Sequence, residues 1–120
     1  MSTYRKAMIE SEMAKLLSSI IFEMKDPRLS GKMISVTRVE LSNDKRYADV
    51  YISVFGSDEE KKEVFEALEH ALGFLRTQVS RNLRLRVAPE IRLREDKGIE
   101  ASVKIHKLLE EIHERDSSDQ

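Results

Sequence analysis

The sequence predicts one α+β domain, built from a three-stranded sheet that carries its helices on one face. Three observations lead to this prediction. The chain has 120 residues, the size of a single domain, and 40% of them are hydrophobic, which is enough for a core. Apolar residues recur every three or four positions in some stretches and every second position in others, the periods of helices and strands. In order, these stretches give α-β-β-α-α-β-α, so a hairpin precedes a helical crossover to a third strand.

The first helix is expected to begin at Ser2 or Thr3, either of which can cap it, and to stop at Asp26-Pro27. The stop follows because the residue before a proline avoids the helical region. A single apolar stripe indicates the buried side of this helix; it consists of Met8, Ile9, Met13, Leu16, Leu17, Ile20, Ile21 and Met24.

A β-hairpin follows. Its first strand, residues 33–42, is rich in β-branched residues, but the apolar positions change phase from Ile34 and Val36 to Val39 and Leu41. A bulge near Thr37-Arg38 would explain this change. The second strand alternates cleanly over residues 48–55, as expected for a half-buried strand. Residues 43–46 supply the turn chemistry that joins the two strands.

Two central helices are predicted next. Ser57 and Glu60 have the spacing of a capping box, which begins an acidic helix over residues 57–70. The apolar stripe continues to residue 83 through Phe65, Leu68, Leu72, Leu75, Val79 and Leu83. Gly73 interrupts it at a cost of about 1 kcal/mol relative to alanine. We therefore expect a kink at Ala71, Leu72 and Gly73, with a basic helix after it.

The third strand starts after Pro89, with Ile91 and Leu93 pointing inward and Arg92 and Arg94 pointing outward. A short amphipathic helix is predicted over residues 105–112. We expect a single domain over residues 1–113, followed by an acidic-polar tail, residues 114–120, that is disordered.

Known catalytic and metal-binding patterns are missing from the sequence. The chain has no cysteine, which excludes disulfides, zinc ribbons and thiol nucleophiles. It contains no GxSxG, HExxH, Walker or GxGxxG motif, and its three histidines, His70, His106 and His113, have no ligand spacing. We expect no catalytic residue, metal or cofactor, and therefore no enzyme. No signal peptide or apolar run long enough to cross a membrane is present, which predicts a cytoplasmic protein.

The charge is strongly segregated, although the net charge is only −1. Residues 76–94 carry six arginines and one glutamate, a net charge of +5. The planar guanidinium group can form paired hydrogen bonds with phosphates and base edges. A surface made of the basic helix and the third strand could therefore bind RNA. The arginines could equally be ordinary exposed side chains. Tyr51 and Phe55, in the exposed phase, could stack on bases, but we favour packing against the N-terminal or C-terminal helix.

Several sequence strings, taken together, resemble the bacterial ribosome-binding factor A family. They are Lys25-Asp26-Pro27-Arg28-Leu29, Val36-Thr37-Arg38-Val39-Glu40-Leu41-Ser42-Asn43-Asp44, Ala48-Asp49-Val50-Tyr51-Ile52-Ser53, Gly73-Phe74-Leu75-Arg76 and Leu85-Arg86-Val87-Ala88-Pro89-Glu90-Ile91. They occur in the family's order and, with the leading helix, cover about residues 4–112. Each string alone is weak, whereas the ordered set is specific.

The resemblance implies a type II KH-like domain, which agrees with the order of elements given above. In that family an interrupted Ala-x-Gly kink replaces the GxxG loop of ordinary KH domains, and it maps here onto Ala71, Leu72 and Gly73. The resemblance also implies a non-enzymatic assembly factor that binds the free small (30S) ribosomal subunit. Such a factor aids late maturation of 16S ribosomal RNA, including its 5′ end, and supports growth in the cold.

For the RNA contacts, we predict Arg76, Arg81, Arg84 and Arg86, supported by Arg92, Arg94, Lys45 and Arg46. The expected partner is the small subunit, with its 16S RNA and neighbouring ribosomal proteins. No small-molecule substrate is expected, and nothing argues for an oligomer, so a monomer is predicted. The alternative is a protein–protein adaptor that docks through the acidic helix 57–70.

Overall fold

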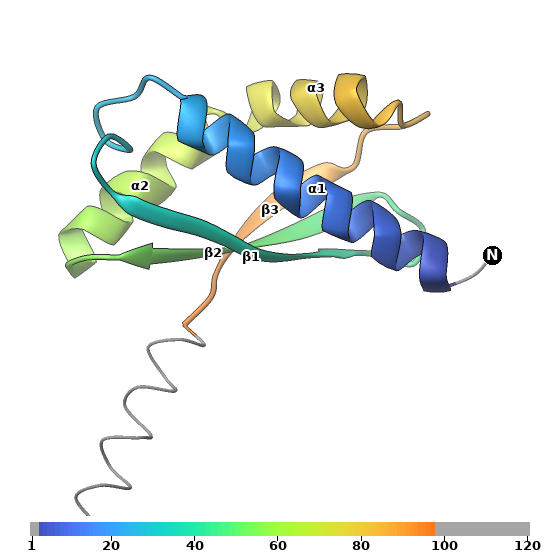
Figure 1. Ribbon diagram of the computed structural model, residues 1–120, viewed down its shortest axis with the longest axis horizontal. Coiled ribbons are helices and arrows are strands. Elements are labelled where there is room, and N and C mark those ends of the chain that lie inside the picture. Colours follow the sequence, from blue (N-terminus) through green and yellow to red (C-terminus); the bar gives the residue numbers. More distant parts are fainter. Residues whose placement is uncertain (1–2, 98–120) are drawn as a thin grey trace, which may run out of the picture.

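The computed structural model describes residues 3–97, which form three helices and three strands (Figure 1). The elements are α1 (Thr3–Glu23), β1 (Met33–Leu41), β2 (Tyr47–Phe55), α2 (Asp58–His70), α3 (Leu72–Leu83) and β3 (Glu90–Glu95). The helix predicted over residues 105–112 and the tail at 114–120 lie outside the described residues. Over residues 3–97 the order of the elements is the predicted one.

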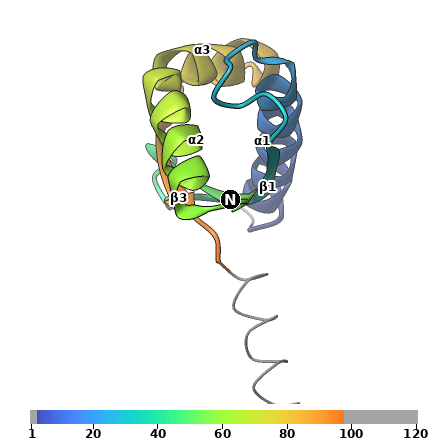
Figure 2. The same cartoon turned by 90° about the vertical axis from the view of Figure 1, so that its left-hand side faces the viewer.

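The sheet has the strand order β1-β2-β3. β1 and β2 are antiparallel, whereas β2 and β3 are parallel and joined through α2 and α3. All three helices lie on one side of the sheet: α1 on the side of β1, α2 on the side of β3, and α3 across the top (Figure 2). The prediction of an α+β fold with helices on one face is therefore confirmed, and the opposite face of the sheet is not covered by α1, α2 or α3. We call it the open face.

The core fills the space between the sheet and the helices. Each element contributes alternate or stripe positions to it: Met13, Leu17 and Ile21 of α1, Val39 and Leu41 of β1, Ala48, Val50, Ile52 and Val54 of β2, Val64, Ala67 and Leu68 of α2, Leu75 and Val79 of α3, and Ile91 of β3. Burying each large aliphatic side chain stabilises the fold by about 1.5–3 kcal/mol relative to exposure. A shift of one residue would expose all the apolar side chains of a strand, so this burial determines which residues of each strand face the helices.

The predicted bulge in the first strand is confirmed. Val36 pairs with Ile52 and Arg38 with Tyr51, so Thr37 is the extra residue between them. The bulge returns the apolar residues of both halves of β1 to the core side. The Thr37 hydroxyl donates to the carboxylate of Asp96 at 2.5 Å and lies 3.3 Å from the carbonyl oxygen of Tyr51.

Helix α1 ends at Glu23, before the predicted stop at Asp26-Pro27. The Asp26 carboxylate accepts hydrogen bonds from the backbone N–H of Arg28 at 2.9 Å and from its guanidinium at 2.9 and 3.1 Å. These bonds form a tight turn ahead of the proline and lower the pKa of Asp26. The Arg28 guanidinium also lies 3.3 Å from the ring of His70, which ties this turn to the end of α2.

The two central helices separate at Ala71, where the backbone takes φ −97° and ψ 5°. Ser57 and Glu60 form the predicted capping box at the start of α2. Gly73 lies inside α3, and a Cβ added there would meet no atom within 4 Å. The break therefore belongs to Ala71, and packing among the described residues does not require glycine at position 73.

Candidate nucleic-acid interface

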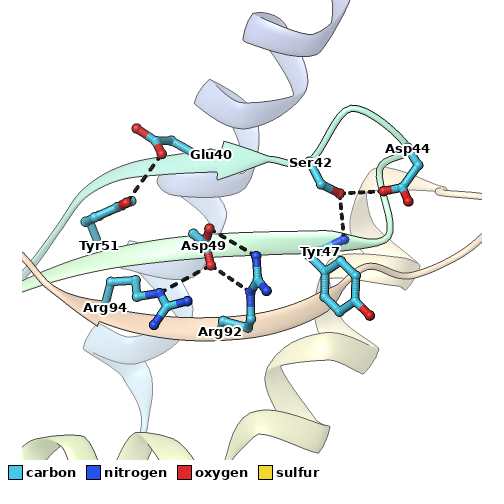
Figure 3. Close-up of polar contacts among 8 residues, drawn as sticks. All are labelled: Glu40, Ser42, Asp44, Tyr47, Asp49, Tyr51, Arg92 and Arg94. Carbon is cyan, nitrogen blue, oxygen red and sulfur yellow. Dashed lines mark hydrogen bonds and ion pairs between the residues drawn. The ribbon is translucent and has the colours of Figure 1, made fainter.

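The open face carries Arg92 and Arg94 of β3 beside Asp49 of β2 (Figure 3). The register of the parallel pair sets this arrangement, because Arg92 is aligned with Asp49 and the buried residues Ala48 and Val50 take the opposite phase. Both arginines thus point away from the helices, as the sequence predicted for β3.

Asp49 binds both of these arginines. The Arg92 guanidinium donates to its two carboxylate oxygens at 2.8 and 3.2 Å, and Arg94 approaches one of them at 3.4 Å. The Arg92 guanidinium also lies over the ring of Tyr47, 4.6 Å from the centroid. This geometry combines a bidentate ion pair with a cation–π contact and compensates much of the positive charge of these two arginines.

A second arginine cluster on the open face lies one strand away. Arg38 lies over the ring of Tyr51 at 3.9 Å and approaches Glu40 at 3.2 Å, and Tyr51 donates to Glu40 at 3.3 Å. Tyr51 and Phe55 do not pack against the N-terminal helix, so that part of the expectation is wrong; the predicted C-terminal helix lies outside the described residues. The phase of β2 that buries Ile52 turns both aromatic rings to the open face, where Phe55 is 77% exposed.

Basic side chains gather around a groove at one end of the molecule. The first half of α1, the β1–β2 turn and the segment after α3 meet there, on the right of Figure 1. The groove has a volume of about 580 Å³. Its charged lining consists of Arg5, Lys45, Arg46, Arg84 and Arg86, with the acids Glu12 and Asp44.

Local backbone geometry brings Arg84 to this groove. Helix α3 ends at Leu83, and Arg84 takes a left-handed conformation with φ 50° and ψ 44°. Arg84 therefore lies beyond the end of α3 and does not continue the helical face that carries Arg76. Across the groove, Lys45 also has a left-handed backbone, with φ 60°, in the turn between β1 and β2.

The arginines of α3 and of the loop after it have few internal partners. Residues 3–97 offer no hydrogen bond or ion pair to the guanidinium groups of Arg81, Arg84 and Arg86, all of which are exposed. Arg76 donates to the carbonyl of Ala88 at 3.1 Å and has no acidic partner among the described residues. These guanidinium groups can therefore bind an anion without first giving up an ion pair.

The expected single surface of basic helix and third strand is thus divided. Four predicted residues, Lys45, Arg46, Arg84 and Arg86, line one groove, while Arg76 and Arg81 lie on α3. Arg92 and Arg94 lie across the sheet, because the alternation of β3 turns them away from the helices. Arg5 was not predicted, and no local signal could have identified it, because only the tertiary fold brings it to this groove.

The acidic helix α2 is partly engaged within the fold. Glu60 completes the capping box, and hydrogen bonds from Ser57 lower its pKa. Glu60 and Glu63 also lie 3.8 and 3.6 Å from the ammonium group of Lys32. Asp58 and Glu59 are exposed in the first turn, where the helix dipole favours acids.

Within residues 3–97, no group of three histidine, aspartate or glutamate side chains could hold a metal ion. No helix in this part of the chain is long and apolar enough to cross a membrane.

Comparisons with known proteins agree on one family. The model of the ribosome-binding factor A family matches residues 5–109. The ribosome-binding factor A of Thermotoga petrophila is 60% identical over 109 residues, which cover 91% of this chain and 83% of that protein. The Pseudothermotoga lettingae relative is 51% identical over 114 residues, with 95% and 96% covered.

Structures described as ribosome-binding factor A have the same fold as this chain. The solution structure of a putative ribosome binding factor A from Thermotoga maritima is 56% identical with a TM-score of 0.71, covering 82% of this chain and 92% of that one. A Thermus thermophilus homology model, fitted into a cryo-EM map of a 30S complex of that factor, is 28% identical with a TM-score of 0.63, covering 77% and 96%. The chain therefore belongs to the ribosome-binding factor A family and has its type II KH-like fold.

Proposed function

We propose that this protein is an assembly factor that binds the free small ribosomal subunit. It contacts 16S ribosomal RNA and assists late maturation of the subunit, including processing of the 16S 5′ end and growth in the cold. It acts as a cytoplasmic monomer without catalysis of its own. Membership of the family supports this proposal, as does the relative fitted into a 30S complex.

The main support for RNA binding is the set of basic side chains around the groove. Arg84 and Arg86 are exposed and have no partner among residues 3–97, so phosphate binding breaks no existing ion pair. Arginine can bind a phosphate through two parallel N–H groups. Arg76 and Arg81 extend this surface along α3. Each phosphate contact releases counterions, so affinity must fall as salt rises.

Arg92 and Arg94 are proposed as weaker contacts. They share the Asp49 carboxylate, and Arg92 also covers Tyr47. An RNA phosphate would have to compete with an acid that is already in place. The RNA role predicted for these two residues is retained with a smaller expected contribution.

The experiment is co-sedimentation with purified small subunits across a salt series, comparing the wild type with Arg84→Glu/Arg86→Glu. Circular dichroism first verifies that the variant is folded. We expect the wild type to bind less as salt rises and the variant to lose binding by more than about tenfold, since two contacts become repulsions. Equal binding by the two proteins would exclude the groove as the contact surface, and no binding by the wild type would exclude the proposed function.

The alternative, an adaptor that docks through helix 57–70, makes the opposite prediction. Glu59→Lys/Glu63→Lys would abolish subunit binding, while the arginine variant would bind normally. We favour RNA binding because Glu63 already contacts Lys32, whereas Arg84 and Arg86 have no such contact within residues 3–97.

The maturation step can be tested in cells. A strain in which Arg84→Glu/Arg86→Glu is the sole copy should accumulate small subunits with unprocessed 16S 5′ ends, most strongly at low temperature. Primer extension on RNA from purified subunits measures the 5′ end. Normal 5′ ends at low temperature would exclude a maturation role that depends on this surface.

A further inference from the structure

The groove at the end of α3 has an apolar floor inside its basic rim. Met8 and Val87 line it and are 49% and 69% exposed, so both offer apolar surface to a ligand. Leu83 and Leu85 also line it and are half-buried. A volume of about 580 Å³ lies within the range of about 300–1,000 Å³ that is typical of small-molecule sites. Phosphate binding alone would require the basic rim but not the apolar floor.

The backbone gives an independent indication. Among residues 3–97, the non-glycine residues with positive φ are Lys45 and Arg84, and both line this groove. A left-handed conformation costs about 1 kcal/mol for a residue with a Cβ, and glycine would avoid the cost. Strained residues of this kind cluster at ligand sites, where the side chain is needed in that position.

We propose that this groove receives one unpaired nucleotide of an RNA strand. Its base lies against Met8 and Val87, while its flanking phosphates bind Arg84, Arg86 and Arg46 on the rim. The proposal rests on the RNA binding proposed above and specifies the form of RNA that is bound. The groove lies at the opposite end of α3 from the helix break at Ala71.

The combination of rim and floor favours an unpaired strand over a duplex. In A-form RNA the bases are stacked inside the helix, so a duplex presents phosphates and sugars but no free base to an apolar floor. An unpaired nucleotide offers both a flat apolar surface and two phosphates. An acidic peptide could satisfy the same rim, but guanidinium groups match the tetrahedral oxygens that flank every base of an RNA strand.

The test compares a fluorescein-labelled single-stranded octanucleotide with an RNA duplex of twelve base pairs, by anisotropy. The variant is Met8→Gln/Val87→Thr, in which near-isosteric polar side chains replace two exposed apolar ones. Met33→Gln is the matched control, because Met33 is 72% exposed and belongs to β1 outside the groove. Both proteins should keep the fold of the wild type.

We expect Met8→Gln/Val87→Thr to bind the octanucleotide about fivefold more weakly, which corresponds to about 1 kcal/mol of lost apolar contact. Its affinity for the duplex and its salt dependence should be unchanged, since no charge is altered. Unchanged octanucleotide binding would overturn the proposal and leave the proposed function intact. Equal losses on both RNAs would also overturn it, because the floor would then not distinguish a free base.

Two further outcomes distinguish failure of the nucleotide proposal from failure of the proposed function. If Met8→Gln/Val87→Thr loses binding to the small subunit but keeps binding to the octanucleotide, a protein segment occupies the groove. That result would overturn the nucleotide proposal. A wild type that binds neither RNA nor small subunits would overturn the proposed function and this inference together.

Discussion

Two regions of this protein carry arginines, and they differ in what the guanidinium groups contact. On the open face, Arg92 and Arg94 share the Asp49 carboxylate. At the groove, Arg84 and Arg86 are exposed and have no partner among residues 3–97. All four belong to the same basic stretch of the sequence and look equivalent there.

Local charge density is therefore a poor measure of how well an arginine can bind a phosphate. An arginine that already holds a carboxylate and an aromatic ring must give up both before it binds a phosphate, whereas an unpaired one gives up only water. Partners that are distant in sequence therefore decide which arginines are available.

The strongest test of this comparison neutralises two arginines in each region. Arg84→Gln/Arg86→Gln and Arg92→Gln/Arg94→Gln change the net charge equally. We expect the groove variant to weaken small-subunit binding by about tenfold and the open-face variant by less than about threefold, because the latter arginines are already compensated. Co-sedimentation at one moderate salt concentration gives both values.

Equal losses in the two variants would mean that net charge alone explains binding, whatever the guanidinium groups contact. A larger loss in the open-face variant would mean that RNA displaces Asp49. Thermal unfolding of both variants is the necessary control, because the open-face pair also contributes to stability.

Removing the carboxylate that Arg92 and Arg94 share should make both arginines available to RNA. In Asp49→Asn, Arg92 and Arg94 lose their common acid and become available, so RNA binding should tighten by about threefold with a steeper salt dependence. The free energy of unfolding should fall by about 1 kcal/mol, because two neighbouring guanidinium groups are left uncompensated. Anisotropy with duplex RNA and urea unfolding measure the two effects. Unchanged RNA binding in a folded variant would mean that Asp49 does not mask these arginines.

Backbone conformation separates the two regions as well. Arg84→Gly removes a side chain from a left-handed position, so the free energy of unfolding should rise by about 0.5–1 kcal/mol while RNA binding weakens. Arg92→Gly should lower it by about 1 kcal/mol, because glycine weakens a strand and the ion pair is lost. Urea unfolding measures both. A loss of stability in Arg84→Gly would show that its side chain supports the fold.

Much of the fold was predictable because its signals are local. The bulge at Thr37 follows from the phase change in β1, and the capping box follows from the spacing of Ser57 and Glu60. The layer order follows from the hairpin and the crossover, since parallel strands need a long connection. The end of α1 was placed too late, because the Asp26–Arg28 hydrogen bonds have no signal in the apolar stripe.

The candidate site was less predictable, because its decisive features are tertiary. Asp49 and Arg92 are separated by 43 positions and meet only through the register of β2 and β3. The left-handed cap at Arg84 could not be predicted, since an arginine carries no signal of such a cap, unlike the glycine usual there. Arg5 comes to the groove from the start of α1.

Only a weak effect is expected from Asp44, an acid that lines the groove. The Ser42 hydroxyl donates to its carboxylate at 2.7 Å and the backbone N–H of Arg46 at 3.1 Å, and these bonds lower the pKa of Asp44. The Arg46 guanidinium is more distant, at 3.9 Å, so this acid hardly compensates a groove arginine, unlike Asp49 on the open face.

The sign of the pH dependence follows from the lowered pKa. Stability from Asp44 is complete above its ordinary pKa of 3.8 and is lost as the pH falls through the lower folded value. Urea unfolding between about pH 5 and pH 2.5 should therefore show a weaker acid dependence in Ser42→Ala, which removes the main cause of the shift. Arg46→Gln should leave the acid dependence almost unchanged, because the guanidinium contributes less than the hydroxyl and the backbone N–H. A larger change in Arg46→Gln than in Ser42→Ala would mean that Asp44 does neutralise Arg46. Arginines at the groove would then be compensated by an acid, as they are on the open face.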